Sequence, residues 1–433
     1  MHDTWHDVPH RMSIGLRRQE RADGFVASES IICNVYHFPG TTVDTDRLDA
    51  AVRRVVAANP ALHSAYRIGA DGAVEHRLLP IPVPLVESSP PDGTTWDDVC
   101  AEARTIAAAE SAVVLDVRTG RPLRIVHVGA EAVGFALVIR IDHSVCDGLS
   151  LAQFLREIGE AFTDDAGYAS AHRDRASLAA VAAAERRVLD GEPGQQVREA
   201  WRGRLPRGVP EVVLERPLPW YEAPPEGDYQ TYTLQGAEYE RHRDEARRLR
   251  VTSFVLATAK VLVALRPHVL GDDLAFFSPL PGRFVPEAAD VVGNFINLLP
   301  VTVEAPREAD VATTVAAVRD GMLWTLRHQG MPFDAIMDEV RHVDATGEKL
   351  PRNRRSIFVA GFPPDDLILD EVRAQTALPR LTTALFDLSL WISDDGERLR
   401  GMAVSRRALV SAERVASWLD ALRRPVASSG GPS

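Results

Sequence analysis

The chain has 433 residues, and its 49 Lys and Arg against 61 Asp and Glu give a formal net charge of −12 at pH 7. A single hydrophobic core stops growing at about 250–300 residues, so this length predicts two lobes of comparable size. The acidic balance argues against a nucleic-acid binder. The 45% hydrophobic content argues against wholesale disorder.

The chain also shows no sign of secretion, disulfide bonding or membrane insertion. Three cysteines, Cys33, Cys100 and Cys146, are too few and too scattered for a disulfide framework or a Cys-x-x-Cys metal site. The start has no apolar run typical of a signal peptide. The longest apolar stretch, residues 254–265, is shorter than the about 20 residues of a membrane helix. We therefore expect a cytoplasmic protein that binds neither membranes nor nucleic acid.

In the first half of the chain, strands alternate with helices whose starts carry capping signals. Asp44 predicts the N-cap of one helix, and Thr95 with Asp98 forms a capping box at the start of another. The predicted strands of this half lie at 28–38, 123–128 and 134–141, and the predicted helices at 44–59, 95–109 and 150–162.

A polar stretch of small residues at 163–176 predicts a linker between the lobes. Beyond it, helices are predicted at 177–189, 252–265 and 412–422, and strands at 274–277, 297–303, 356–360 and 386–392. Strands that alternate with helices in both halves predict two α/β lobes with mixed sheets. We expect the first lobe to comprise residues 1–172 and the second 173–433.

The most informative stretch is residues 141–148, IDHSVCDG. A buried strand delivers His143 to a tight turn, where an imidazole can accept a proton near neutral pH. Asp147 is too close in sequence to act as a second base, and we expect it to anchor the turn. Gly148 permits a sharp reversal or the close approach of a substrate. A structural histidine and an ordinary helix cap would give the same pattern, so the pattern alone does not predict an enzyme.

The surrounding segments resemble, in order, those of the condensation domains of nonribosomal peptide synthetases. These domains belong to the chloramphenicol-acetyltransferase-like superfamily of acyltransferases. The resemblance covers about 390 residues, and its collinearity is more specific than any one piece. The segments are CNVY (33–36), the run 43–66, DVRTGRPLRIVHV (116–128), IDHSVCDG, VTSFVLATAKVLVAL (251–265), PLPGR (279–283), VVGNFINLLPV (291–301), LRHQGMPFDAIMDEV (326–340), RSIFVAGF (355–362) and FDLSLWI (386–392).

The resemblance implies an α/β (α+β) fold of two chloramphenicol-acetyltransferase-like lobes in a V, with a tunnel between them. In such a fold His143 would be the catalytic base, Asp147 a structural residue, and Gly148 a donor to the developing oxyanion. Three further residues are candidate substrate or tunnel groups: Asp142, Ser150 and Asn297. A hydrogen bond at a strand end is the alternative role for Asn297.

The resemblance also implies the substrates. The donor would be an acyl thioester on the phosphopantetheine arm of an acyl or peptidyl carrier protein, or on CoA, with no permanently bound cofactor. The acceptor would be a small or tethered amine or alcohol. We expect a free-standing acyltransferase (a condensation enzyme that forms amides or esters) of natural-product or antibiotic biosynthesis, because the sequence shows no carrier or adenylation segment.

Two positions depart from the family pattern. Asp142 replaces the first histidine of the motif, and His63 replaces an arginine that pairs with the motif aspartate in the family. We expect Arg124 to replace that arginine as the structural partner of Asp147. A lost anchor would instead leave an inactive, condensation-like binding or recruitment module. The absence of a D-F-G-W-G run disfavours a free acyl-CoA donor without excluding it.

Other catalytic classes find less support. Residues 148–152, GLSLA, match a loosened nucleophile elbow, but Ser150 lies well beyond the strand end near Ile141 where such a serine must project. No H-E-x-x-H pattern or Cys/His cluster predicts a metal. His37 and His127 lie on apolar strands and are expected in the core.

Overall fold

The computed structural model describes most of the chain, in two compact units. The described residues are 4–10, 12, 16, 31–69, 73–89, 91, 93, 95–113, 117–119, 121–130, 133–172, 174–206, 209–210, 212–214, 224, 226–270, 274–339, 356–361, 366–376 and 383–426. Unit 1 comprises Met1–Gly191, Pro281–Ile296 and Asp365–Pro379, and unit 2 comprises Glu192–Leu280, Asn297–Pro364 and Arg380–Ser433.

These units differ from a simple division of the chain after residue 172. Unit 1 continues to Gly191, and two later segments, Pro281–Ile296 and Asp365–Pro379, return to it. The stretch 163–176, expected to be a linker, contains helix α5 (Asp165–Ala171), whose Tyr168 is buried in the core of unit 1. Small polar residues on the exposed side of this short helix gave it the composition of a linker.

Unit 1 is built on a five-stranded sheet in the order β16-β2-β7-β6-β5, with a small sheet β1-β4-β3 beside it. In the larger sheet only β5 and β6 are parallel. The strands of unit 1 are β1 (His6–Asp7), β2 (Ile31–Pro39), β3 (Ser64–Ile68), β4 (Val74–Leu78), β5 (Val86–Ser89), β6 (Leu123–Ala130), β7 (Gly134–Asp142), β14 (Ile368–Leu369), β15 (Val372–Arg373) and β16 (Gln375–Thr376). Its other helices are α2 (Thr45–Ala58), α3 (Trp96–Ser111), α4 (Gly148–Thr163) and α6 (Leu178–Asp190).

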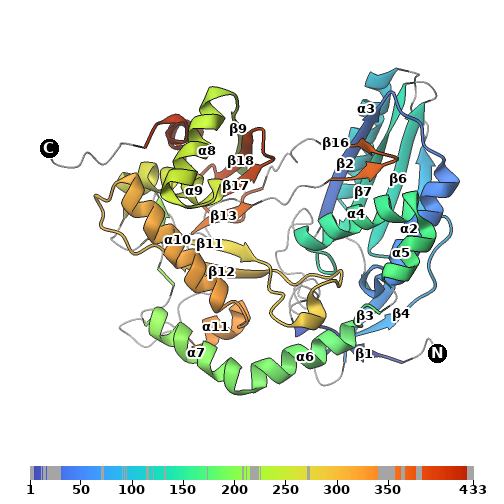
Figure 1. Ribbon diagram of the computed structural model, residues 1–433, viewed down its shortest axis with the longest axis horizontal. Helices are drawn as coiled ribbons and strands as arrows, with labels where there is room; N and C mark the ends of the chain where they lie inside the picture. Colours follow the sequence, from blue (N-terminus) through green and yellow to red (C-terminus); the bar gives the residue numbers. More distant parts are fainter. Residues whose placement is uncertain are drawn as a thin grey trace. The chain divides into compact units, whose positions relative to one another are not determined.

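Both faces of the five-stranded sheet are covered. Side chains alternate along β6 and β7, so each strand contributes to a hydrophobic cluster on either face. Val126, Val128, Ala136 and Val138 pack with α3 on one face. Ile125, Phe135, Leu137 and Ile139 pack with α2 and α4 on the other. Figure 1 shows α3 on one side of the sheet and α2 with α4 on the other. All nine residues of β7 are consequently buried, which makes its C-terminal end a rigid support.

The capping residues predicted from the sequence are confirmed. The side chain of Asp44 accepts hydrogen bonds from the first turn of α2, and Thr95 and Asp98 form the reciprocal capping box of α3. The strand predicted at 28–38 is β2, although residues 28–30 lie outside the described residues.

Unit 2 is built on a six-stranded mixed sheet in the order β12-β11-β13-β17-β18-β9. Strands β11, β13 and β17 run parallel, and the outer pairs are antiparallel. Its strands are β8 (Val213–Leu214), β9 (Gly227–Leu234), β10 (Val269–Leu270), β11 (Ala275–Leu280), β12 (Asn297–Thr302), β13 (Ile357–Gly361), β17 (Leu388–Asp394) and β18 (Leu399–Arg406). Its helices are α7 (Glu192–Arg204), α8 (Ala237–Leu249), α9 (Ser253–Leu265), α10 (Val311–Arg327), α11 (Phe333–Glu339) and α12 (Ala412–Leu419).

Helix α9 is the apolar stretch that the sequence places at 252–265, and its one charged residue is buried. Lys260 is 3% exposed, and its Nζ donates to Glu245 Oε2 at 2.7 Å and to the Arg424 carbonyl at 2.9 Å. The other oxygen of Glu245 accepts from the Val426 N–H at 2.8 Å. This ion pair therefore holds the last described residues against α9. Within the part of the chain that the structure describes, no helix has the length and apolar character to cross a bilayer.

A second buried charge, Glu157 of α4, organises the helical side of unit 1. Its carboxylate accepts hydrogen bonds from Arg175 at 2.6 Å, Tyr168 at 2.7 Å, Gln153 at 2.8 Å and Asn59 at 3.0 Å. Burial alone would raise the pKa of Glu157, but the hydrogen bonds and charge of Arg175, helped by Gln153 and Tyr168, lower it below the ordinary value. The folded protein therefore holds this carboxyl ionised.

Replacing Glu157 by Ala is expected to lower the free energy of unfolding by about 3–5 kcal/mol at pH 7, because Arg175 would be left buried without its counter-charge. Urea unfolding followed by circular dichroism measures this loss. The matched control is Glu160→Ala on the same helix, because its pair with Arg156 is exposed and is expected to contribute no more than about 1 kcal/mol. Equal losses in the two variants would contradict the role of the buried network.

The same network predicts a dependence on pH. Since the folded-state pKa of Glu157 is lowered, its contribution to stability is fully present above the unfolded pKa of about 4.3 and is lost as pH falls through the folded pKa. The stability difference between wild type and Glu157→Ala is therefore expected to narrow below about pH 4.3. A difference that stays constant down to acid unfolding would speak against this assignment.

Candidate active site

The motif turn in unit 1 begins where β7 ends. The N–H of Asp142, the last residue of β7, donates to the Pro122 carbonyl at 2.8 Å, and its own carbonyl accepts from the Val145 N–H at 3.2 Å. Its carboxylate Oδ1 accepts from Ser144 N at 2.8 Å and from Ser144 Oγ at 2.6 Å. Asp142 is fully buried, so this candidate tunnel residue forms the turn instead of lining an open site.

His143 follows at once and is half-buried. Its ring nitrogen Nδ1 is buried and has no hydrogen-bond partner among the described residues. Its backbone carbonyl accepts a hydrogen bond at 2.7 Å from Nδ2 of Asn294. The imidazole thus projects from the end of a buried strand, and Asn294 holds this residue through its backbone carbonyl.

Asp147 is fully buried and caps α4. Its Oδ1 accepts from Ser150 N at 2.7 Å, and its Oδ2 accepts from Phe295 N at 2.8 Å. Its own N–H donates to the Gly293 carbonyl at 3.1 Å. Arg283 Nη2 lies 3.5 Å from Oδ1 and supplies the opposite charge. With both oxygens engaged, Asp147 anchors the turn, as its place before a helix start suggested.

Arg283 stabilises the fold of the segment Pro281–Ile296 through hydrogen bonds from its guanidinium. It donates to the carbonyls of Ala288 at 2.7 Å and Val291 at 2.8 Å, and to Ser150 Oγ at 2.7 Å. Its guanidinium carbon also lies 4.4 Å from the centre of the Phe295 ring, within cation–π range. The residue before it, Gly282, has a φ of 64°, a left-handed conformation that favours glycine and turns the chain toward α4.

The structure contradicts the prediction that Arg124 pairs with Asp147. Arg124 instead binds Glu87 at 2.7 Å and also binds Glu110. His63, at the position of the missing family arginine, is bound through Nδ1 to the Leu79 carbonyl at 3.0 Å. The cation beside Asp147 is Arg283, 136 residues away in sequence, and the Gly-Arg pair of the PLPGR stretch was the signal that could have found it.

Ser150 is fully buried, and its hydroxyl is fully engaged. Oγ donates to the Gly293 carbonyl at 2.6 Å and accepts from Gly293 N at 3.0 Å and from Arg283. A hydroxyl with its proton and both lone pairs in use, away from solvent, has nothing left for nucleophilic attack or substrate binding. Ser150 therefore joins α4 to the segment Pro281–Ile296, and its hydrogen bonds argue against a role as a hydrolase nucleophile.

Gly148 is the first residue of α4. Among the described residues the glycines with positive φ are Gly40, Gly134, Gly236, Gly282 and Gly396. Gly148 is not one of them, so its backbone does not require glycine for a left-handed turn. Its N–H belongs to the first turn of a 16-residue helix, where amide groups lack intrahelical acceptors and the helix dipole favours negative charge.

Asn297 lies in unit 2 as the first residue of β12, and it is 1% exposed. Its Nδ2 donates to the carbonyls of Gln329 at 3.0 Å and Met331 at 2.7 Å, and its Oδ1 accepts from Phe333 N at 3.1 Å. These are the strand-end hydrogen bonds of the alternative role, and they leave no open polar group for a tunnel. The asparagine that reaches the motif turn is Asn294, which sequence reasoning missed although it stands in the same GNFIN run.

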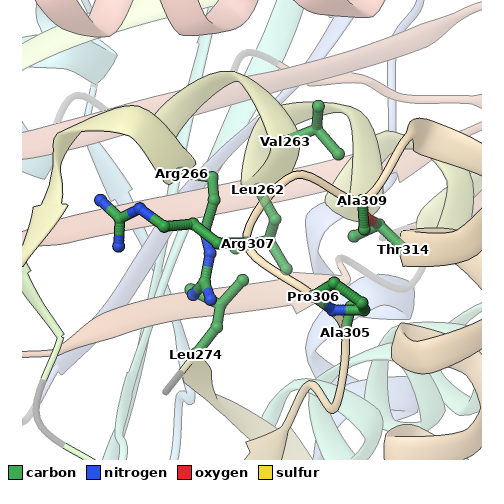
Figure 2. Close-up of a pocket in the computed structure, with 9 residues that line it drawn as sticks. All are labelled: Leu262, Val263, Arg266, Leu274, Ala305, Pro306, Arg307, Ala309 and Thr314. Atoms are coloured by element: carbon green, nitrogen blue, oxygen red, sulfur yellow. The ribbon is translucent and has the colours of Figure 1, made fainter. Parts of the chain in front are cut away.

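Figure 2 shows a pocket of unit 2 beside α9, where Arg266 and Arg307 extend among apolar side chains. Its lining contains no carboxylate, thiol or imidazole, and Arg307 donates to the Val269 carbonyl at 2.9 Å. Among the described residues, no group of three or more His, Cys, Asp or Glu side chains is arranged to hold a metal ion.

The family model named Condensation domain matches residues 28–425. The chain belongs to the condensation-domain family. Phosphinothricin tripeptide synthetase PhsC of Streptomyces viridochromogenes is 26% identical in an alignment of 416 positions that covers 90% of this chain. The chain spans 37% of the length of that synthetase.

Solved structures of condensation domains share the fold. The first condensation domain of the calcium-dependent antibiotic synthetase, in complex with a substrate analogue, has a TM-score of 0.80 at 16% identity, over 99% of this chain and 98% of that one. The X-domain from teicoplanin biosynthesis, in complex with OxyB, has a TM-score of 0.71 at 20% identity, over 97% of this chain and 92% of that one. The two-lobed, mixed α/β condensation-domain fold predicted from the sequence is confirmed.

Replacing Arg283 by Met is expected to lower the free energy of unfolding by about 3–5 kcal/mol, because Asp147 would stay buried without its cation. Chemical unfolding at neutral pH measures the change. The control is Arg124→Met, since the Arg124 side chain is 43% exposed and its ion pairs are expected to contribute about 1 kcal/mol or less. A larger loss in the Arg124 variant would reverse the assignment of the structural cation.

Proposed function

We propose that this condensation domain joins an acyl thioester, carried on the phosphopantetheine arm of a carrier protein, to an amine or hydroxyl acceptor. Family membership carries this proposal, together with the half-buried His143 at the end of β7. Relatives such as a tripeptide synthetase favour amide formation, with ester formation as the other outcome. The carrier would be supplied from outside these 433 residues, and CoA is the alternative thiol.

In this reaction His143 acts as the general base. The acceptor nitrogen or oxygen attacks the thioester carbonyl carbon, and its proton passes to the imidazole as the new C–N or C–O bond forms. Collapse of the tetrahedral intermediate breaks the C–S bond, and the proton passes on to the leaving thiolate. General base assistance of this kind is worth about 10²–10⁴-fold in rate. Holding both substrates at one site adds the advantage of proximity.

The start of α4 is suited to the charge that develops on the carbonyl oxygen. Gly148 is its first residue, and the N–H groups of a first helical turn have no acceptor within the helix. Asp147 takes the Ser150 N–H of that turn. Of the other N–H groups of the turn, we assign that of Gly148, the residue next to the motif aspartate, to the oxyanion. Glycine at this position lets a substrate oxygen approach the backbone closely.

A recruitment module without turnover is the second candidate. It is favoured by the resemblance to an X-domain whose solved structure holds OxyB, and by Asp142 in place of the first motif histidine. Against it stands Arg283, because Asp147 keeps a cation despite the loss of the family arginine at His63. A bound partner protein with no acyl transfer in any assay would favour this candidate.

Replacing His143 by Ala is expected to abolish product formation while leaving the fold intact, because Nδ1 of the ring makes no hydrogen bond within the described residues. Intact-mass analysis of a panel of acyl-loaded carrier proteins, mixed with amine and alcohol acceptors, detects transfer as a loss of acyl mass. His37→Ala, a half-buried histidine of β2, is the control and is expected to retain turnover. Retained turnover in His143→Ala would remove the general base from the proposal.

Replacing Ser150 by Ala separates acyl transfer from a serine hydrolase. Loss of the hydroxyl leaves the Gly293 N–H and one Arg283 donor without their acceptor, so the melting temperature is expected to fall. Assayed below that temperature, the variant is expected to keep transferring acyl groups. Complete loss of turnover in a folded Ser150→Ala protein would support a nucleophilic serine instead.

A further inference from the structure

We propose that Asn294 is a positioning residue for His143, an inference that rests on the proposed acyl transfer. Its Nδ2 donates to the His143 carbonyl at 2.7 Å, across 151 positions of sequence. Both residues belong to unit 1, so the hydrogen bond lies within one compact body. It joins the motif turn to the returning segment Pro281–Ile296 at the residue that carries the imidazole.

The backbone on both sides of Asn294 is fixed. Gly293 before it makes hydrogen bonds through its N–H and its carbonyl to Ser150 Oγ, at 3.0 and 2.6 Å. Phe295 after it donates its N–H to Asp147 Oδ2 at 2.8 Å. Three buried hydrogen bonds therefore hold the two flanking residues on α4 and its cap. The side chain of Asn294 is presented to the turn from a support that does not depend on its own amide.

The orientation of the His143 ring depends on its backbone, because the structure shows no hydrogen bond at Nδ1 among the described residues to orient the ring directly. A histidine base is ordinarily oriented by a hydrogen bond from the ring nitrogen that does not react. Here Nδ1 of His143 is buried, and no hydrogen-bond partner for it lies in the part of the chain that the structure describes. The direction of the imidazole consequently depends on the backbone from which it projects. On one side that backbone is held by Asp142, which binds Ser144, and at the His143 carbonyl it is held by Asn294.

Removing the Asn294 amide donor is therefore expected to act on the chemical step more than on substrate binding or folding. A displacement of a catalytic group by about 1 Å can reduce the rate by about 10²-fold. We expect Asn294→Leu, which keeps the size of the side chain, to lower kcat by about 10–100-fold with KM little changed. Asn294→Asp keeps the shape but cannot donate to a carbonyl, and an equal loss is expected. Asn294→Gln keeps an amide donor and should recover part of the lost kcat.

The test combines kinetics with a readout that is independent of turnover. Acyl-pantetheine thioesters and a panel of amines serve as probes for kcat and KM, and circular dichroism melting confirms that each variant is folded at the assay temperature. In protein labelled with ¹⁵N-histidine, the ring signals of His143 are identified by their absence in His143→Ala. These signals are expected to shift or broaden in Asn294→Leu and Asn294→Asp while those of the other histidines stay in place.

Asn34→Leu is the matched control, because it removes a side-chain amide of the same unit that donates to Tyr36 Oη at 3.3 Å. Wild-type kcat in folded Asn294→Leu and Asn294→Asp would overturn the positioning role, as would equal losses in Asn294→Gln and Asn294→Leu. If His143→Ala itself keeps wild-type turnover, the general-base role of His143 fails, and the positioning role of Asn294 fails with it. If His143→Ala is inactive and the Asn294 variants are normal, only the present inference fails.

Discussion

The organisation of the motif turn depends on one constraint, the need to satisfy the buried carboxylate of Asp147. A charge removed from water is costly unless it is paired and hydrogen-bonded. Asp147 meets this need by capping α4, by accepting the Phe295 N–H and by facing Arg283. Each of these contacts also fixes a neighbouring element. The carboxylate thereby links the end of β7, the start of α4 and the segment Pro281–Ile296.

Arg283 and Ser150 extend this link into a closed network. The guanidinium donates to two carbonyls of its own segment and to Ser150 Oγ. The same hydroxyl accepts from the Gly293 N–H and donates to the Gly293 carbonyl. The segment Pro281–Ile296 is therefore bound both to the buried carboxylate of Asp147 and to Ser150 at the start of α4, which leaves it little freedom to move. This rigidity allows Asn294, between two fixed neighbours, to hold the His143 carbonyl.

The structure accounts for both departures from the family pattern. Asp142 forms the turn through Ser144, so an acidic residue at the first motif position has a structural role. The arginine that the family places at His63 is absent, but Arg283 supplies the cation that Asp147 requires. The reason for expecting an unanchored, inactive site is weakened accordingly, because the anchor exists and comes from another part of the chain.

Local signals in the sequence determined part of the elements, the family and the place of the motif. Strands such as β9 and β18 and helices such as α8 and α10 were not predicted. Caps such as Asp44 and Thr95, the strands at 123–128 and 134–141, and the collinear family segments depend on neighbours along the chain, and each was confirmed. The role of Asp147 as a helix cap was visible for the same reason. The cation that pairs with Asp147 was not visible, because an ion pair between residues 136 positions apart produces no local sequence pattern around either residue.

Tertiary structure alone decided which polar residues meet. Ser150, Asp142 and Asn297 looked available in sequence, yet burial commits each of them to backbone hydrogen bonds or to the turn. Asn294 and Asn297 stand three residues apart and end in different units, one on the motif turn and one on the α10–α11 connection. A residue type and its neighbours fix what a side chain can bond to, whereas the folded chain fixes which partner lies within 3 Å of it.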